Sequence, residues 1–208
     1  MIGVLALQGA FIEHENMLRS LGVECREIRQ KSDLEGIDGI ILPGGESTVQ
    51  GQLMRKTGIM TPLREMIKDG LPTFATCAGL ILLAEEVEDE PETHLGVLPV
   101  KVRRNAYGRQ LGSFRTTASV KGIGGFPMVF IRAPYISDPK DTEVLAEVGN
   151  RVVAARHKNI IAMAFHPELT GDGRMHESFL NDIRFASPRI AVLPTATDYK
   201  TRIARQVI

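Results

Sequence analysis

The stretch that decides the fold is Pro72-Thr73-Phe74-Ala75-Thr76-Cys77-Ala78-Gly79-Leu80-Ile81-Leu82-Leu83-Ala84. In it, a short apolar strand passes through small residues directly into a strongly apolar helix. A continuous apolar run of strand length is typical of a strand that is buried on both faces, as in a parallel sheet covered by helices. The stretch therefore predicts a strand and a helix joined by a tight turn at Cys77.

Short apolar runs bounded by glycine or proline recur along the chain, at Ile2–Leu7, Gly39–Leu42, Thr73–Ala75, Met128–Ile131, Val152–Ala155 and Ile160–Phe165. Segments with helical spacing lie between the early runs, at His14–Leu21, Val49–Met54 and Pro62–Ile67. Strands that alternate with helices predict an α/β protein, a flavodoxin-like three-layer sandwich with a mostly parallel central sheet and helices on both faces. The stretch from Leu95 to Ser119 is rich in β-branched residues and is interrupted by glycines, which predicts a small antiparallel elaboration.

The composition favours one domain and offers no global signal for a partner. A chain of 208 residues with 43% hydrophobic content suits a single core. We expect a domain over residues 1–186 and a peripheral extension over residues 187–208, where prolines and polar residues gather. Lysine plus arginine equals aspartate plus glutamate at 25 each, so we expect neither nucleic acid nor a membrane as partner.

Cysteine usage and the N-terminus predict a cytoplasmic protein. The two cysteines, Cys25 and Cys77, form no Cys-x-x-Cys pair and no His/Cys cluster, so we expect no disulfide framework, no metal site and no cofactor. The first apolar run lacks a basic flank and is too short for a signal peptide or a membrane span. The acidic run Glu85–Glu92 is expected to be a solvated loop at the end of a helix, without chemistry.

Cys77 lies at the predicted strand-to-helix turn, the place of the nucleophile in a nucleophile elbow. Small neighbours such as Ala75 and Gly79 let the backbones approach closely there. The N-terminus of the following helix favours the thiolate, which is the reactive form of cysteine. Most lone cysteines are buried structural residues, and this segment alone leaves both interpretations open.

A histidine and a carboxylate follow the apolar run that ends near Ala164, in Phe165-His166-Pro167-Glu168. A cysteine nucleophile needs a base, and the base needs a third group that fixes its tautomer and orientation. On an extended strand, His166 and Glu168 would share a face and could fill both roles. By itself, a His-Pro-Glu triplet is more often a histidine in a turn. The remaining histidines, His14, His94, His157 and His176, are expected at the surface.

The stretch Leu42-Pro43-Gly44-Gly45-Glu46-Ser47-Thr48 opens a strand into a loop with paired glycines. One interpretation is an oxyanion hole, formed by the N–H groups of Gly45 and of Ala78, the residue after the proposed nucleophile. A phosphate cradle is disfavoured because the lysine and the spacing of a Walker motif are absent. A plain turn with Ser47 as a helix cap remains an alternative.

Taken in order, Gly-Gly-Glu-Ser, Thr-Cys-Ala-Gly-Leu and His-Pro-Glu resemble the motifs of the class I (triad) glutamine amidotransferases. More narrowly, the chain resembles the family of glutaminase subunits of pyridoxal 5'-phosphate synthase, over roughly residues 1–186. The stretches that carry this narrower likeness are Gly3–Ala10, Leu42–Thr48, Arg104–Gln110 and Phe130–Pro134. One departure is Ala75, where the family usually has glycine; the elbow must accept one more methyl group there.

The resemblance implies hydrolysis of L-glutamine to glutamate and ammonia, with the ammonia passed to a separate synthase (lyase) subunit in a large hetero-oligomer. It makes Cys77 the nucleophile, His166 the base and then the acid, and Glu168 the orienting group. The substrate-binding residues that it implies are Gly45, Glu46, Ser47, Arg104, Ile131 and Arg132, and it ties Gln8 to activation by the partner. The rival interpretations are a glutaminase of another synthase, a γ-glutamyl hydrolase, and a catalytically silent adaptor on the same fold.

Overall fold

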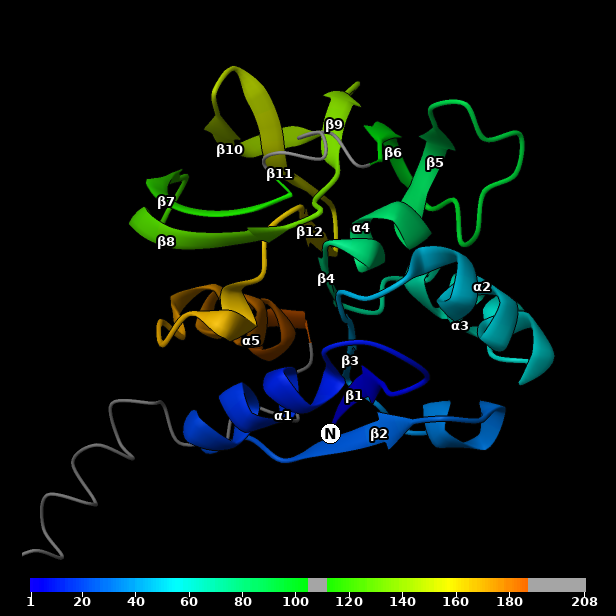
Figure 1. The fold of residues 1–208 in the computed structure, drawn as a ribbon. Helices are drawn as coiled ribbons and strands as arrows, with labels where there is room; N and C mark the ends of the chain where they lie inside the picture. Colours follow the sequence, from blue (N-terminus) through cyan, green and yellow to red (C-terminus); the bar gives the residue numbers. More distant parts are fainter. Residues whose placement is uncertain (105–111, 187–208) are drawn as a thin grey trace, which may run out of the picture.

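The computed structural model of the chain describes residues 1–104 and 112–186 (Figure 1). The predicted extension over residues 187–208 lies outside the described residues, as does most of the stretch that follows Arg104. Within the described ranges, no helix is both long enough and apolar enough to cross a membrane.

The core of the protein is a five-stranded parallel sheet with the strand order β2-β1-β3-β4-β12. The strands are β1 (Ile2–Leu5), β2 (Cys25–Ile28), β3 (Gly39–Leu42), β4 (Thr73–Thr76) and β12 (Ile160–Met163). All but β2 are buried at every position, which explains their unbroken apolar sequences. The order reverses direction at β1, so the crevice between the ends of β1 and β3 is the expected ligand site of this topology.

Helices cover both faces of the parallel sheet (Figure 1). On one face lie α1 (Phe11–Ser20) and α5 (Arg174–Ala186), and on the other lie α2 (Ser47–Lys56), α3 (Met60–Lys68) and α4 (Ala78–Leu83). Each helix of the first face turns an apolar stripe inward, as Leu18 of α1 and Ile183 of α5 illustrate. The predicted three-layer α/β fold is confirmed.

The antiparallel part of the sheet is larger than the predicted elaboration. Beyond β12 the sheet continues through β11 (Arg151–His157), β10 (Glu143–Val148), β7 (Ser113–Val120) and β8 (Gly124–Ile131), each antiparallel to the strand before it. A branch of the sheet contains β5 (Ala84–Val87), β6 (Leu98–Arg103) and β9 (Tyr135–Asp138). The apolar runs in β8 and β11 are mostly buried, as those of the parallel core are, so their composition does not reveal strand direction.

The start of the acidic run is a strand, which corrects the expected loop. Residues Ala84–Val87 form β5, which pairs in parallel with β6. Ala84 and Val87 are buried at its two ends, whereas Glu86 is exposed and its carboxylate accepts a hydrogen bond of 2.7 Å from Lys140. Burial at both ends anchors the segment, and paired lysines compensate its charge.

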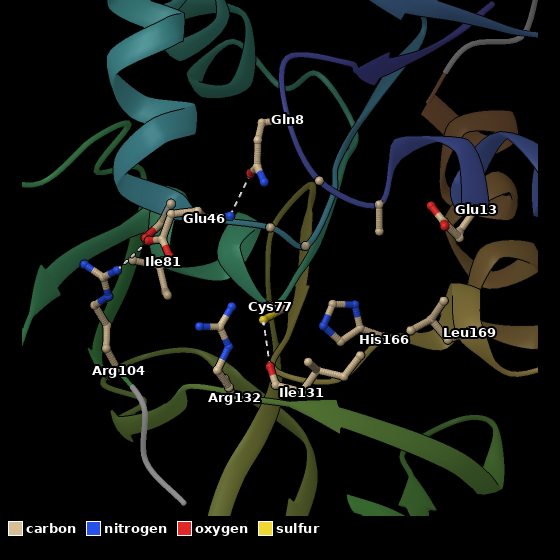
Figure 2. A pocket seen from close by; sticks show the side chains of 15 residues that line it. Gln8, Glu13, Glu46, Cys77, Ile81, Arg104, Ile131, Arg132, His166 and Leu169 are labelled. Carbon is tan, nitrogen blue, oxygen red and sulfur yellow. Dashed lines mark hydrogen bonds and ion pairs between the residues drawn. The ribbon is translucent and has the colours of Figure 1, made fainter. Parts of the chain in front are cut away.

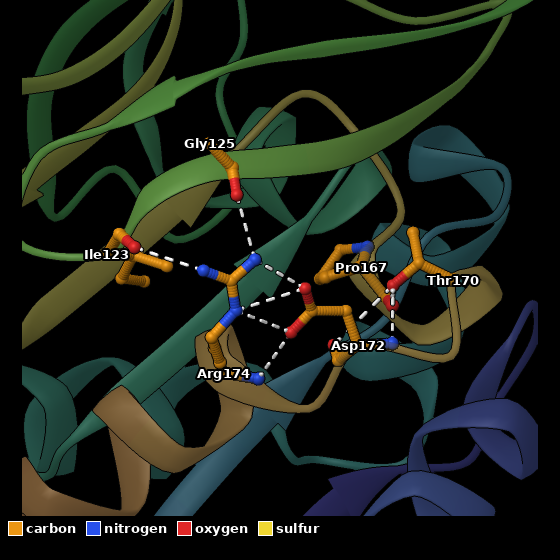
Figure 3. Close-up of polar contacts among 6 residues, drawn as sticks. All are labelled: Ile123, Gly125, Pro167, Thr170, Asp172 and Arg174. Carbon is orange, nitrogen blue, oxygen red and sulfur yellow. Dashed lines mark hydrogen bonds and ion pairs between the residues drawn. The ribbon is translucent and has the colours of Figure 1, made fainter.

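A polar clamp ties the start of α5 to the turn between β7 and β8 and to the first residues of β8 (Figure 3). The Arg174 guanidinium donates hydrogen bonds to the carbonyl of Ile123 at 3.0 Å and to that of Gly125 at 2.8 Å. The same guanidinium forms an ion pair with Asp172, whose N–H donates to the Thr170 hydroxyl. The loop before α5 is thereby fixed against the strand whose far end reaches the cavity described below.

Candidate active site

Cys77 stands at the tight turn between β4 and α4, with φ 47° and ψ −100°. A positive φ at a non-glycine residue costs on the order of 1–3 kcal/mol and persists only where its surroundings enforce it. The Cys77 N–H donates to the carbonyl of Met163 at 2.8 Å, which ties the turn to the end of β12. The Cys77 Sγ lies 3.9 Å from the carbonyl oxygen of Ile131, and the residue is only 6% exposed. The predicted elbow is therefore present, with its strain centred on the cysteine.

Small residues on both sides of Cys77 make the elbow sterically possible. A Cβ atom on Gly79 would lie 2.2 Å from the carbonyl oxygen of Leu42, so only glycine fits at the start of α4. Ala75 lies in β4 between Leu42 of β3 and Ala162 of β12, and it is fully buried. It is not among the described residues with positive φ, so the extra methyl group is compatible with the backbone.

His166 and Glu168 meet behind the elbow, but not on an extended strand. His166 follows β12 and caps a short 3-10 helix, η2 (Pro167–Leu169), in which Glu168 is the middle residue. The expected strand geometry is wrong because Pro167, with its fixed φ, occupies the first position of this helix. The two side chains still lie side by side, with 2.7 Å between His166 Nδ1 and Glu168 Oε1.

Electrostatics favour the charged forms of this histidine and this carboxylate. Burial alone would lower the pKa of His166, but hydrogen bonds to Cys77 and Glu168, together with their negative charges, raise its pKa to about 10. Burial would likewise raise the pKa of Glu168, yet its interactions with His14 and His166 bring that pKa below the ordinary value. The arrangement can hold a thiolate, an imidazolium and a carboxylate in series, which is the requirement for nucleophilic catalysis by cysteine.

The glycine loop is pinned at three points beside the elbow. The Gly44 N–H donates to Thr76 Oγ1 at 3.0 Å, and the Gly44 carbonyl accepts a bond of 2.9 Å from the Ala10 N–H. The Glu46 N–H donates to Gln8 Oε1 at 2.7 Å. Thr76 of β4 and the segment between β1 and α1 therefore set the conformation of this loop.

Ser47 is not the helix cap that the plain-turn alternative requires. It is the first residue of α2, the cap position is Glu46, and no side chain there bonds to the helix. The Ser47 hydroxyl is buried and has no hydrogen-bond partner among the described residues. An unpaired buried hydroxyl that lines a cavity is well placed to bind a ligand.

A cavity of about 350 Å³ opens at the carboxyl ends of the parallel strands (Figure 2). Of the predicted site residues it brings together Gln8, Gly45, Glu46, Ser47, Cys77, Arg104, Ile131, Arg132 and His166. Glu168 and Ala78 do not line it, because Glu168 lies behind His166 and Ala78 lies under the elbow. The site sits beside the reversal in strand order at β1, where this topology predicts it.

Arg104 reaches the cavity already engaged by two carboxylates. Its guanidinium lies 2.9 Å from Glu46 Oε1 and also pairs with Glu90 of the acidic run. The acidic run, to which the sequence assigned no role, thus supports a residue of the cavity wall. Arg132 follows β8 with φ 44° and lines the same side of the cavity as Arg104 (Figure 2).

Three of the four histidines expected at the surface are buried: His14, His94 and His176, whereas His157 is partly exposed. The expectation fails because a buried histidine can be stabilised by a partner that lies far away in the sequence. His14 and His176 form such a pair, with 3.0 Å between Nδ1 of His14 and Nε2 of His176. The sequence does carry one signal. His14 stands four residues before the buried Leu18, on the same inward stripe of α1.

The fold and the comparisons with known proteins together place the chain among the glutamine amidotransferases. A crystal structure of a glutamine amidotransferase superposes with a TM-score of 0.85 at 48% identity, over 88% of this chain and 98% of that one. The model of the SNO glutamine amidotransferase family matches residues 4–184, and the chain belongs to that family. It is accordingly an enzyme with the glutaminase activity of that class.

Two curated relatives are similar over most of their length. The pyridoxal 5'-phosphate synthase subunit PdxT of Desulfitobacterium hafniense (strain DSM 10664 / DCB-2) is 56% identical over 184 residues, which are 88% of this chain and 92% of that protein. The subunit of the same name from Streptococcus pneumoniae (strain ATCC 700669 / Spain 23F-1) is 54% identical over 185 residues, 86% of this chain and 96% of the relative.

Proposed function

We propose that the protein hydrolyses L-glutamine with a Cys77–His166–Glu168 triad and supplies the ammonia to a pyridoxal 5'-phosphate synthase subunit. The observation that carries the proposal is the position of His166, hydrogen-bonded to Glu168 and to Cys77 at the cavity wall. The names of the two curated relatives support the partner and the pathway.

In the first half of the reaction, the Cys77 thiolate attacks the side-chain amide carbon of glutamine. The tetrahedral intermediate collapses as the carbon–nitrogen bond breaks, and the His166 imidazolium gives its proton to the departing nitrogen. Ammonia leaves, and a γ-glutamyl thioester remains on Cys77. The raised pKa of His166 supports this role, because it keeps the imidazole protonated and beside the thiolate at neutral pH.

In the second half, His166 is neutral and takes a proton from water as the water attacks the thioester. Glutamate leaves with the carbon–sulfur bond broken, and the proton on His166 restores the original ion pair. Glu168 remains a carboxylate throughout and holds the Nδ1–H of His166, so that Nε2 faces the thiol.

We assign the oxyanion hole to the N–H groups of Gly45 and Ala78. The Gly44 carbonyl is held by Ala10, and the described chain has no cis peptide, so the Gly45 N–H points away from Ala10. Among the described residues, no acceptor is bonded to this N–H. Ala78 is the first residue of α4, where a backbone N–H has no partner within the helix.

We assign the amino-acid end of glutamine to the wall that carries Glu46, Ser47, Arg104 and the Ile131–Arg132 segment. A guanidinium binds an α-carboxylate through charge-assisted hydrogen bonds, and a carboxylate suits the α-ammonium group. The ion pair between Arg104 and Glu46 keeps both groups in place before the substrate arrives. When glutamine binds, the ion pair between Arg104 and Glu46 is replaced by two others. Arg104 then pairs with the α-carboxylate of glutamine, and Glu46 pairs with its α-ammonium group.

Gln8 is the residue through which we expect a partner to affect catalysis. Its side chain accepts the Glu46 N–H, and its backbone carbonyl accepts a hydrogen bond from Gln50 of α2. Hydrogen bonds therefore join the loop after β1 to the glycine loop and to α2. A synthase subunit that docks there, in a large hetero-oligomer, would change the oxyanion hole and the access of water to the site.

The test uses glutamine carrying heavy nitrogen in its amide, incubated with the protein and a pyridoxal 5'-phosphate synthase subunit. We expect heavy nitrogen in the pyridoxal 5'-phosphate formed with wild type, and none with Cys77→Ala. Labelled ammonium salt serves as the control, because it should support synthesis with either variant. Equal incorporation from glutamine by Cys77→Ala would contradict the proposal. Glutamate release without transfer would indicate a glutaminase of another synthase or a γ-glutamyl hydrolase.

A further inference from the structure

We propose that His14 is a positioning residue of the glutaminase reaction, which holds the second oxygen of Glu168 and links this carboxylate to the glycine loop. The inference rests on the proposed function, because it assigns a role in that reaction to a residue outside the cavity. Neither the motifs in the sequence nor the cavity lining includes His14.

His14 points from α1 into the protein interior toward the back of the triad. The side chains of His14 and Glu168 are both completely buried, with 3.5 Å between His14 Nε2 and Glu168 Oε2. The other carboxylate oxygen, Oε1, is the one that binds His166. Two imidazoles, from α1 and from the end of β12, therefore face the two oxygens of a single buried carboxylate.

The carboxylate decides which nitrogen of His14 carries the proton. Glu168 Oε2 can only accept, and it has no hydrogen-bond partner in the described structure, so a lone pair on His14 Nε2 would be repelled. The favoured form is thus Nε2–H, which leaves Nδ1 to accept the Nε2–H of His176, 3.0 Å away. His14 is neutral in this state, since burial holds its pKa below the ordinary value against the opposing charge of Glu168.

The contact between His14 and Glu168 is long for a hydrogen bond, but its length is compatible with a role during turnover. Catalytic hydrogen bonds are often long in the free enzyme and tighten when the substrate is bound. An N–H dipole aimed at a buried carboxylate lowers the cost of keeping it charged. By holding Oε2, His14 prevents the carboxylate from rotating away from His166.

His14 also connects the triad to the glycine loop. Its Nε2 lies 3.2 Å from Thr76 Oγ1, and this hydroxyl accepts the Gly44 N–H at 3.0 Å. Thr76 directly precedes Cys77 at the end of β4. A single buried imidazole thus touches both the group that orients the base and the hydroxyl that anchors the proposed oxyanion loop.

The alternative is that His14 is a structural core residue that only packs α1 against the sheet. Its ring does lie edge-on to Phe74, with 6.1 Å between the ring centres, as a packing residue would. Packing alone, however, would be served by any apolar side chain. It does not explain why buried polar atoms of Thr76, Glu168 and His176 converge on the two nitrogens of this ring.

Variants that separate the two nitrogens test the proposal. The full chain is assembled with the synthase subunit, and glutamate release is measured for wild type, His14→Gln and His14→Asn. The amide nitrogen of glutamine reaches the place of Nε2, whereas that of asparagine reaches only the place of Nδ1. We expect His14→Asn to lower kcat roughly 10- to 100-fold, as a misplaced catalytic group does. KM for glutamine should not change, and His14→Gln should retain most of kcat.

Leu18→Ala is the matched control, because Leu18 lies one turn further along the same buried stripe of α1. It should lower Tm without lowering kcat at a temperature where the protein is folded. The proposal is overturned if His14→Asn has the kcat of wild type, or if both His14 variants lose activity only in proportion to Tm, as a packing residue would.

A second measurement needs no variant and no activity. The nitrogen chemical shifts of the His14 imidazole in the wild-type protein should report the neutral Nε2–H form, and a neutral Nδ1–H form would contradict the assignment. If wild type itself releases no glutamate, the proposed function fails, whereas the tautomer of His14 is read independently of it.

Discussion

Gly44 and His166 lie so close together that a Cβ atom on Gly44 would stand 2.2 Å from Cε1 of the imidazole and 3.3 Å from the Cβ of Cys77. The glycine loop and the imidazole of His166 are therefore packed against each other, not merely near the same cavity. An added methyl group must displace either the ring or the loop, since neither neighbour is the free end of a flexible side chain.

The first prediction follows from this contact. Gly44→Ala should lower kcat roughly 100-fold, because a shift of about 1 Å in His166 breaks its alignment with Cys77. Steady-state glutamate release in the assembled enzyme measures the effect. Gly171→Ala is the control, since a Cβ atom there meets nothing within 4 Å and the backbone has an ordinary φ. Full activity in Gly44→Ala would show that the loop is not held against the base during turnover.

Arg104 should contribute to binding of glutamine more than to the chemical step. Replacement by glutamine removes the charge that we assign to the α-carboxylate, a contact of about 1.5–3 kcal/mol. Arg104→Gln should therefore raise KM by roughly 10- to 100-fold with a smaller change in kcat. The neighbouring Arg103→Gln provides the control, because Arg103 points outward and pairs with Glu88. An unchanged KM in Arg104→Gln would remove Arg104 from the substrate site.

The reactivity of Cys77 should depend on the imidazolium of His166. Burial would lower the pKa of His166, but its hydrogen bonds to Cys77 and Glu168 raise that pKa to about 10, so the imidazole beside Cys77 stays protonated across the neutral range. Cys25 is an internal reference, because burial, together with the charge of Glu15, raises its pKa above the ordinary value. At pH 7, iodoacetamide should modify Cys77 faster than Cys25, as followed by peptide mass spectrometry.

His166→Gln removes the imidazolium and should lower the rate at Cys77 relative to that at Cys25. Equal rates at Cys77 in wild type and in His166→Gln would argue against an ion pair between Cys77 and His166.

Gln8 should act through its side-chain oxygen. Gln8→Ala leaves the Glu46 N–H without its acceptor and should lower kcat by about 5-fold, a net loss of about 1 kcal/mol. Gln8→Glu keeps an acceptor at the same place and should retain more activity. Glutamate release with the synthase subunit bound compares the two variants. Equal losses in both would mean that the amide nitrogen of Gln8, not its oxygen, is the functional atom.

The parallel core was predictable from the sequence because buried strands leave a plain apolar pattern. The run Gly39–Leu42 has the same bounds as β3, and Thr73–Ala75 lacks only the last residue of β4. The elbow at Cys77 was predictable because small residues surround the cysteine in the sequence. The structure gives the reason for one of them, since a Cβ atom on Gly79 would collide with the backbone of Leu42.

The parts that could not be predicted depend on contacts between distant segments. The ion pair between Arg104 and Glu90 joins two loops, and the buried pair of His14 and His176 joins helices from opposite ends of the described chain. No local pattern distinguishes a histidine that has a buried partner from one that is solvated. The bend at Pro167 was missed because the apolar run before it continues smoothly into His166.

The account depends on Cys77 as the attacking group, and the most direct test is glutamate release from L-glutamine by wild type and Cys77→Ala, each assembled with a synthase subunit. The account predicts steady turnover by wild type and no release above background by Cys77→Ala, although the variant still assembles and folds. Undiminished glutamate release by Cys77→Ala would contradict it.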